Sequence, residues 1–190
     1  SPFSKLFLAS QYNIFYEKDT FLASKFSGAM NTNSSMTKNL NFNAKLNLID
    51  QYNLIANYTT GKTLVNTSEN SLIYSLSDIT SDSYSIALLS NNIFYKNDEY
   101  TLSYGQPLRV NNGYIFLNIP SGLNLDDTVS FRKQSINLTP SGKEINVKSS
   151  YSFDLNKNTE LTSIIIYTRE NNNNSMEPIW ETFIKLKSNF

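Results

Sequence analysis

The feature that most constrains this fold is an alternation of apolar and polar residues that recurs through nearly the whole chain. In residues 38–49, leucine, phenylalanine or alanine occupies every second position from Leu40 to Leu48, with asparagine or lysine between. Successive side chains of a β-strand point to opposite faces, whereas a helix would spread those asparagines around its circumference. The pattern predicts strands with one apolar and one polar face, and its recurrence predicts an all-β chain.

The alternation predicts ten strands and two weaker ones, joined mostly as antiparallel hairpins. They are residues 4–17, 21–30, 38–49, 51–60, 82–95, 99–110, 114–119, 143–155, 159–169 and 179–190, and the weaker 72–76 and 129–138. Many are nine to fourteen residues long, which exceeds ordinary strands and suits a tilted crossing of a bilayer. Asn111-Asn112-Gly113 predicts a tight turn. Pro107 lacks a backbone donor and predicts a bulge or bend in its strand.

Composition removes several classes of function. Sixteen basic and sixteen acidic residues give no net charge, and they are scattered, so no nucleic-acid partner is expected. The chain has no cysteine and no histidine, which removes thiolate chemistry, Cys/His zinc sites and any nucleophile activated by an imidazole. We therefore expect no catalytic, cofactor-binding or metal-binding residues. The polar mean hydropathy of -0.36 is compatible with a barrel, in which only every second residue needs to be apolar.

Two segments carry a resemblance beyond periodicity: residues 102–110 (LSYGQPLRV), followed by Asn-Asn-Gly, and residues 138–144 (LTPSGKE). Together with the hairpin over residues 83–99, the stretch 167–169 and the terminal Phe190, they resemble the C-terminal translocator region of subtilisin-like autotransporter serine proteases. The resemblance covers about residues 78–190 and, more weakly, 1–60. Lys143 stands where that family usually has arginine, and Ser188 is smaller than the usual apolar residue.

The resemblance implies an antiparallel transmembrane β-barrel of about 10 to 12 strands in a bacterial outer membrane. Residues 1–190 would form one barrel domain, preceded by further strands, a linker helix and a passenger. The barrel would support surface display or secretion of that N-terminal protease passenger, which would hold the catalytic triad, so this chain is not expected to be an enzyme. Its implied partners are outer-membrane lipid, the β-barrel assembly machinery and the passenger. The assembly machinery would recognise the last strand through Phe190, Leu186, Ile184 and Trp180.

Charged residues at polar positions of the alternation are candidates for the lumen of such a barrel, where opposite charges pair and tune hydration. The candidates are Lys45, Glu99, Arg109, Glu144, Lys148, Arg169, Glu181 and Lys185. The alternative is that they line the solvent face of an ordinary sheet.

A second interpretation stays open on the residues alone. A soluble or surface-exposed β-sandwich, located at the cell surface or outside the cell, would serve as an adhesion or structural module and self-assemble through its sheet edges. The two interpretations differ in architecture. A barrel is a single sheet with its apolar face outward, whereas a sandwich packs two sheets around an apolar interior.

Overall fold

The computed structural model describes residues 5–21, 24–25, 27–49, 51–69 and 71–188, and over these residues the chain is built from β-strands. Helical structure in the described part is limited to two short 3₁₀ turns, η1 (Gly28–Met30) and η2 (Asn171–Asn173). No helix among these residues is long and apolar enough to cross a membrane. The antiparallel all-β architecture predicted from the alternation is confirmed.

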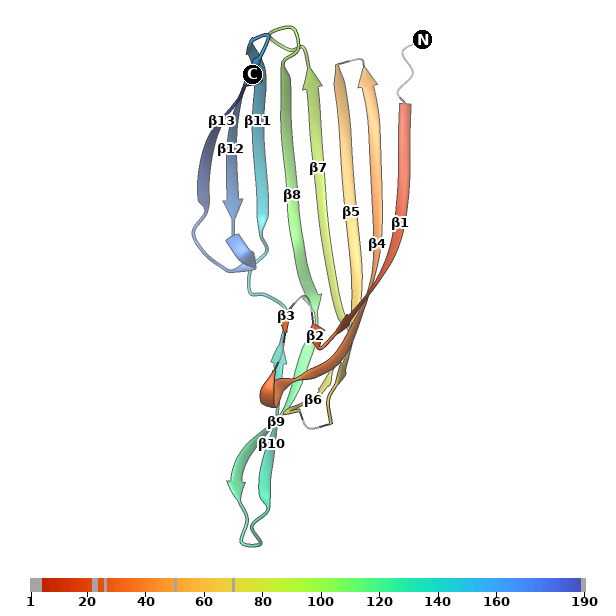
Figure 1. Ribbon diagram of the computed structural model, residues 1–190, viewed down its shortest axis with the longest axis vertical. Helices are drawn as coiled ribbons and strands as arrows, with labels where there is room; N and C mark the ends of the chain where they lie inside the picture. The colour runs from red at the N-terminus through yellow and green to blue at the C-terminus, as the bar shows by residue number, and fades with distance from the viewer. Residues whose placement is uncertain (1–4, 22–23, 26, 50, 70, 189–190) are drawn as a thin grey trace.

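Eight strands form one tall sheet in which each strand lies antiparallel to its neighbours (Figure 1). In order across the sheet they are β1 (Lys5–Lys18), β4 (Thr32–Ile49), β5 (Tyr52–Thr67), β7 (Ile79–Asn91), β8 (Glu99–Asn112), β11 (Ile145–Asn156), β12 (Thr159–Arg169) and β13 (Ile179–Ser188). β1 and β13 are the two edges, and no ladder between described residues joins them. The described strands therefore form an open sheet.

The two ends of the sheet are connected differently (Figure 1). At one end, called the short-turn end, residues 50–51, 92–98 and 157–158 link neighbouring strands, and β1 begins and β13 ends there. At the opposite, long-loop end, the connections are residues 19–31, 68–78, 113–144 and 170–178. The five remaining strands of the described chain and η1 lie in the first three of these long connections, and η2 lies in the fourth.

A second, three-stranded sheet at the long-loop end holds most of the buried apolar residues. Its order is β10 (Val129–Asn137), β9 (Tyr114–Leu123) and β6 (Ile73–Leu76). Ile73, Ile115 and Leu117 form its core. The N–H of Leu72 donates to the Ala29 carbonyl at 2.7 Å, and the Leu72 carbonyl accepts from Asn118 at 2.8 Å, so three connections are held together. The core thus lies beyond the end of the tall sheet, and the β9–β10 hairpin projects further (Figure 1).

Two predictions at this end are wrong. Residues 21–30 do not form one strand: the connection holds the short hairpin of β2 (Thr20–Phe21) and β3 (Ser24–Lys25), then η1. Residues 111–113 are not a tight turn either, because β9 continues where β8 ends (Figure 1). A Cβ added at Gly113 would lie 3.0 Å from Cγ1 of Ile79, so this glycine permits a close approach to Ile79.

β4 and β5 are longer than predicted because their polar ends pair with each other. The hydroxyls of Thr37 and Thr63 lie 2.9 Å apart, and Asn66 Nδ2 donates to Ser34 Oγ at 3.2 Å. Residues of this kind extend a ladder through side-chain hydrogen bonds across strands. They leave no apolar alternation, so the hydropathy pattern does not reveal this part of the hairpin.

Candidate functional site: the two faces of the tall sheet

Cross-strand register brings the apolar residues of all eight strands to one face, called the apolar face. Its clearest row is formed by leucines at directly opposed positions of β1, β4, β5, β7 and β8, here called the leucine row: Leu6, Leu46, Leu54, Leu88 and Leu102. The same row continues through Ser149 and Ile165 to Thr182 on β13. A one-residue slip in any pairing would break this row, so the hydrophobic pattern specifies the register.

The apolar face is open to its surroundings. Leu8 on β1 is 72% exposed and Ile184 on β13 is 75% exposed, and Leu102 in the middle of the sheet still exposes 41%. No second layer of the described chain covers it, since the three-stranded sheet lies beyond the end of the strands (Figure 1). Exposed apolar surface that continues over a whole sheet marks a site of contact with a membrane or another protein.

Aromatic side chains lie on both sides of the leucine row along the strands. Toward the short-turn end these are Tyr52, Tyr100, Tyr151 and Phe153, and toward the long-loop end Phe42, Tyr58, Tyr84, Tyr104, Tyr167 and Trp180. Beyond the second group, Lys38 stands opposite Lys62, which forms an ion pair with Asp78, but Ile14, Tyr16, Met36 and Leu64 continue the apolar face at this end of β1, β4 and β5. The apolar face is therefore a band with aromatic borders that extends further on these three strands.

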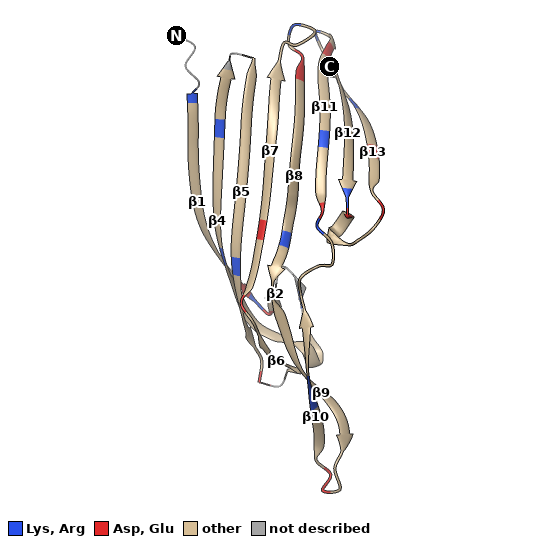
Figure 2. Ribbon diagram, turned by 180° about the vertical axis from the view of Figure 1, so that it is seen from behind, with Lys and Arg blue, Asp and Glu red and all other residues tan. Residues whose placement is uncertain are grey.

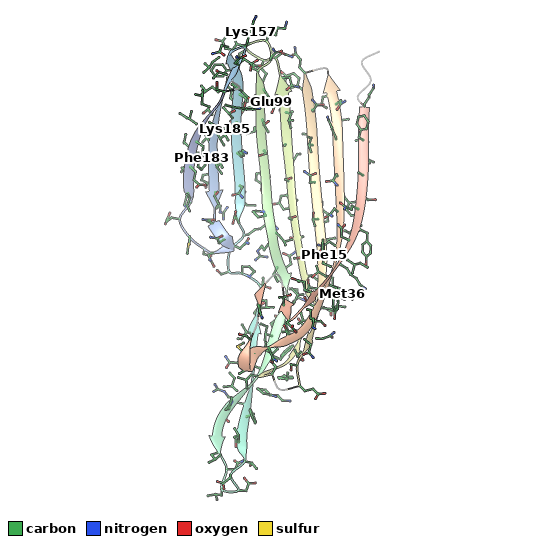
Figure 3. The ribbon with its side chains drawn as sticks, in the orientation of Figure 1. Phe15, Met36, Glu99, Lys157, Phe183 and Lys185 are labelled. Atoms are coloured by element: carbon green, nitrogen blue, oxygen red, sulfur yellow. The ribbon has the colours of Figure 1, made fainter. Side chains whose placement is uncertain are left out.

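The opposite face, called the polar face, is lined mainly by small uncharged polar residues. One row runs across it through Asn43, Asn57, Ser85, Gly105 and Asn146. Asn57 Nδ2 donates to Ser85 Oγ at 3.1 Å within this row. Apolar exceptions occur on the edge strands, at Phe7, Phe15 and Phe183, of which Figure 3 labels the last two. They also occur on inner strands, at Ile55, Leu89, Ile164 and Ile166.

Five of the candidate charges lie on the polar face. Lys45, Lys148 and Glu181 belong to one row across the sheet. Ile55, Ala87 and Ser103 stand between Lys45 and Lys148, and Ile166 stands between Lys148 and Glu181. Glu99 and Lys185 belong to a row nearer the short-turn end, where Figure 3 labels both. Figure 2 shows how thinly charge is spread over the tall strands. The role of these charges in a lumen stays a prediction.

Arg109 and Arg169, by contrast, are on the apolar face, contrary to their predicted polar-face positions. The predicted bulge at Pro107 is confirmed: Tyr84 pairs with Gln106 and Asp82 with Arg109, so β8 has one residue more than β7. The extra residue reverses the facing of Arg109. Arg169 pairs with Ile145 at the end of β12. It follows Tyr167 by two positions, so both side chains lie on the apolar face.

The eighth candidate, Glu144, borders a hollow on the polar face. The hollow has a volume of about 480 Å³, and Ser103, Asn146, Lys148 and Glu181 are among its lining residues. Glu144 accepts hydrogen bonds from Asn146 Nδ2 at 2.9 Å and from the N–H of Asn172 at 2.7 Å. It therefore fixes the β12–β13 connection against the start of β11, with Lys148 and Glu181 deeper along the strands.

One buried carboxylate with several hydrogen-bond donors was not predicted from the sequence. Asp98, 2% exposed, lies in the β7–β8 connection and accepts hydrogen bonds from the N–H groups of Ile93, Phe94 and Tyr95 and from the Tyr151 hydroxyl, all between 2.7 and 2.9 Å. Burial opposes its ionisation, but the amides of Tyr95 and Phe94 and the Tyr151 hydroxyl outweigh burial and lower its pKa to about 2. An Asp in a polar turn gives no sequence signal for this position.

The residues proposed as a recognition signal lie on the β13 edge. Trp180, Ile184 and Leu186 share the apolar face and are 69%, 75% and 61% exposed. Phe190 lies outside the described residues. Within the described part of the chain, the outer edge of β13 therefore has an unpaired backbone, and three of its exposed apolar side chains lie on the apolar face.

Two further observations concern metal ligands and similarity to known proteins. No group of three or more acidic side chains among the described residues could hold a metal ion. Comparison of the chain with family models, with curated proteins and with solved structures finds no match. The two faces of the sheet are the observations on which the function proposed below rests.

Proposed function

We propose that the tall sheet is the lipid-facing wall of a β-barrel in a bacterial outer membrane. The observation that carries this proposal is the apolar face, which continues over all eight strands, is exposed, and has aromatic residues at both borders. Barrels that span outer membranes combine such an apolar band and aromatic borders with polar side chains on the opposite, inner face. A soluble monomer rarely exposes so continuous an apolar surface.

The loop lengths support an orientation for this barrel. Outer-membrane barrels have short turns on the periplasmic side and long loops on the outside. The long-loop end, with the β9–β10 hairpin, is then extracellular, and the start of β1 and the end of β13 are periplasmic.

The resemblance to autotransporter translocators gives this barrel its role. The chain supports display or secretion of an N-terminal protease passenger, which would reach β1 from the periplasmic side, and it does not catalyse a reaction itself. The polar face, with the Glu144 hollow, would then line the route across the membrane.

The two sheet edges are where this barrel would close. β1 and β13 run in opposite directions, so they are suited to antiparallel pairing directly or through further strands that bring the total to between ten and twelve. Closure removes exposed strand edges. The β-barrel assembly machinery would bind the β13 edge through Trp180, Ile184 and Leu186, in addition to Phe190.

The unpaired edges also favour a second candidate, a surface module that self-assembles edge to edge. Such a module would bury the apolar face against a second sheet, and it would form soluble oligomers.

Folding the chain in detergent and in phospholipid vesicles separates these candidates. The barrel proposal expects partition into detergent, a mobility on unboiled gels that changes on heating, and tight association with vesicles that resists high salt. A monodisperse monomer or oligomer that is soluble without detergent and ignores vesicles would refute the barrel.

A further inference from the structure

At the long-loop end of the apolar face, a small apolar hollow lies beside two basic residues. The hollow has a volume of about 260 Å³ and is lined by Val147, Ser149, Ile165, Tyr167 and Trp180. It arises because the leucine row is interrupted on β11, where the small Ser149 stands between Leu102 and Ile165. The Trp180 ring packs against Tyr167 with centroids 4.8 Å apart and forms one wall.

The two basic residues, called the basic pair, are Lys143 and Arg169. Arg169 follows Tyr167 by two positions on the same face of β12, or about 7 Å along the strand. Lys143 Nζ lies 5.5 Å from the centroid of the Tyr84 ring, and both positive charges act on the nearby Tyr104 hydroxyl. The basic pair is thus at the aromatic border of the apolar band, next to the hollow.

Hydrogen bonds to the surrounding backbone hold Lys143 in place. Arg109 donates through Nε to the Gly142 carbonyl at 2.8 Å and through Nη2 to the Pro140 carbonyl at 3.0 Å, which fixes the turn before Lys143. The backbone N–H of Lys143 donates to Glu170 Oε2 at 2.5 Å. The Lys143 side chain is exposed, and it forms no ion pair with another described residue.

Two carboxylates lie among the basic residues of this border and offset part of their charge. Glu170 Oε1 accepts from Arg169 Nη2 at 3.3 Å, and Asp82 stands opposite Arg109 on the same face. The amide of Lys143 outweighs burial and lowers the pKa of Glu170, so Glu170 is ionised at neutral pH. The Arg169 side chain is nevertheless 64% exposed against 22% for Glu170, so the guanidinium faces outward with donors to spare.

We propose that the basic pair and the hollow form a binding site for an anionic, phosphate-bearing lipid of the outer leaflet. Arg169 and Lys143 bind the headgroup phosphate, the first as a planar fork and the second as a point charge. Part of one acyl chain lies in the hollow against Trp180. The site rests on the proposed function, because an acyl chain reaches the hollow only if the apolar face meets lipid.

Trp180 is the single tryptophan of the chain, so its fluorescence reports on the hollow. The chain is folded into phosphatidylcholine vesicles in which the bromine-labelled acyl chains, which quench tryptophan, are carried by phosphatidylcholine or, at the same mole fraction, by phosphatidic acid. One basic side chain near a membrane surface contributes about fivefold in local lipid concentration. Since Glu170 offsets one charge of the basic pair and Asp82 stands opposite Arg109, one net positive charge remains. We therefore expect brominated phosphatidic acid to occupy the hollow about fivefold more than its mole fraction.

Matched variants identify the residues responsible. Lys143→Gln with Arg169→Gln should abolish the preference for phosphatidic acid, while Arg132→Gln with Lys133→Gln, an equal change of charge on the β9–β10 hairpin, should keep it. Equal enrichment in the first variant would overturn the site, as would loss in both.

The remaining outcomes distinguish the two proposals. Quenching by brominated phosphatidylcholine without a preference for phosphatidic acid overturns the lipid site and leaves the membrane wall standing. No quenching by either lipid overturns the membrane wall itself. Complete loss of the preference when inorganic phosphate is added overturns lipid specificity and leaves a site for free phosphate.

Discussion

At the scale of single residues, this chain depends on a few side chains that fix its connections. Asp98 gathers three backbone amides and the Tyr151 hydroxyl, which folds residues 92–98 back over β11. The Phe94 and Tyr151 rings meet edge to face at 5.9 Å on the outside of this connection. The connection is therefore ordered by one carboxylate, and its stability should depend on the charge of that carboxylate.

Asp98→Asn should destabilise the fold at neutral pH and change its acid sensitivity. The pKa of Asp98 falls from 3.8 to about 2 on folding, so its contribution is complete above pH 3.8 and is lost as the pH falls through about 2. Urea unfolding midpoints of the wild type and variant should differ at pH 7 and converge near pH 2. Asp127→Asn, in the β9–β10 turn, is the control and should leave the midpoint unchanged. A constant difference at all pH values would contradict the role of the charge.

Gly105→Ala should destabilise the centre of the polar face. An added Cβ would lie 2.8 Å from the Tyr84 carbonyl oxygen and 3.0 Å from Ser85 Cβ, so the strands must shift. We expect a loss of about 1–3 kcal/mol in the free energy of unfolding. Gly122→Ala is the matched control because no atom lies within 4 Å of its added Cβ. Equal stability of the two variants would contradict the close approach of β8 to β7 at Gly105.

At the scale of elements, the bounds of each strand and the face on which each side chain lies depend on cross-strand pairing. The alternation alone predicts β12 at its observed bounds and β1 within one residue at each end. The alternation fails at Arg109, because a bulge reverses the face on which every later residue of the strand lies. It also fails at residues 21–30, because the connection after β1 forms the short hairpin of β2 and β3 and the turn η1. Of the eight candidate charges, Lys45, Glu99, Lys148, Glu181 and Lys185 lie on the polar face as predicted. Arg109, after the bulge, and Arg169, two residues after Tyr167, lie on the apolar face instead.

Neighbouring residues of β4 test the two-faced assignment directly. Leu46→Lys puts a charge in the leucine row and should cost roughly 2 to 4 kcal/mol if that row lies near the bilayer midplane, because the ammonium group would lie in lipid. Lys45→Leu, on the polar face, should be mild. Unfolding in vesicles measures both. Equal tolerance at the two positions would rule out a lipid-facing and a polar face.

At the scale of the whole molecule, short turns and long connections gather at opposite ends of the sheet (Figure 1). The long-loop end contains a separate small core around Ile73, Ile115 and Leu117. The β9–β10 hairpin projects beyond this core and presents Leu125, which is fully exposed at its tip. The molecule therefore has two distinguishable ends, and the membrane proposal assigns them to opposite sides of the bilayer.

Single cysteines test that orientation without interference, because the chain has none of its own. With the chain produced in a bacterial outer membrane, Leu125→Cys should react on intact cells with a maleimide that does not cross membranes. Lys157→Cys, in the β11–β12 turn at the other end, should react only after the membrane is opened (Figure 3). The reverse labelling pattern would invert the orientation, and labelling of both on intact cells would contradict a membrane-spanning sheet.

The sequence by itself determined the class of the fold and the two faces of most strands, because side-chain direction in a strand depends only on position modulo two. It also excluded chemistry that needs cysteine or histidine. Only the tertiary structure decided which strands are neighbours, that the described sheet has two open edges, and that Arg109, Lys143 and Arg169 lie at one border of the apolar face. Those facts depend on bulges and on contacts between residues far apart in the chain, and the local alternation of apolar and polar residues predicts neither.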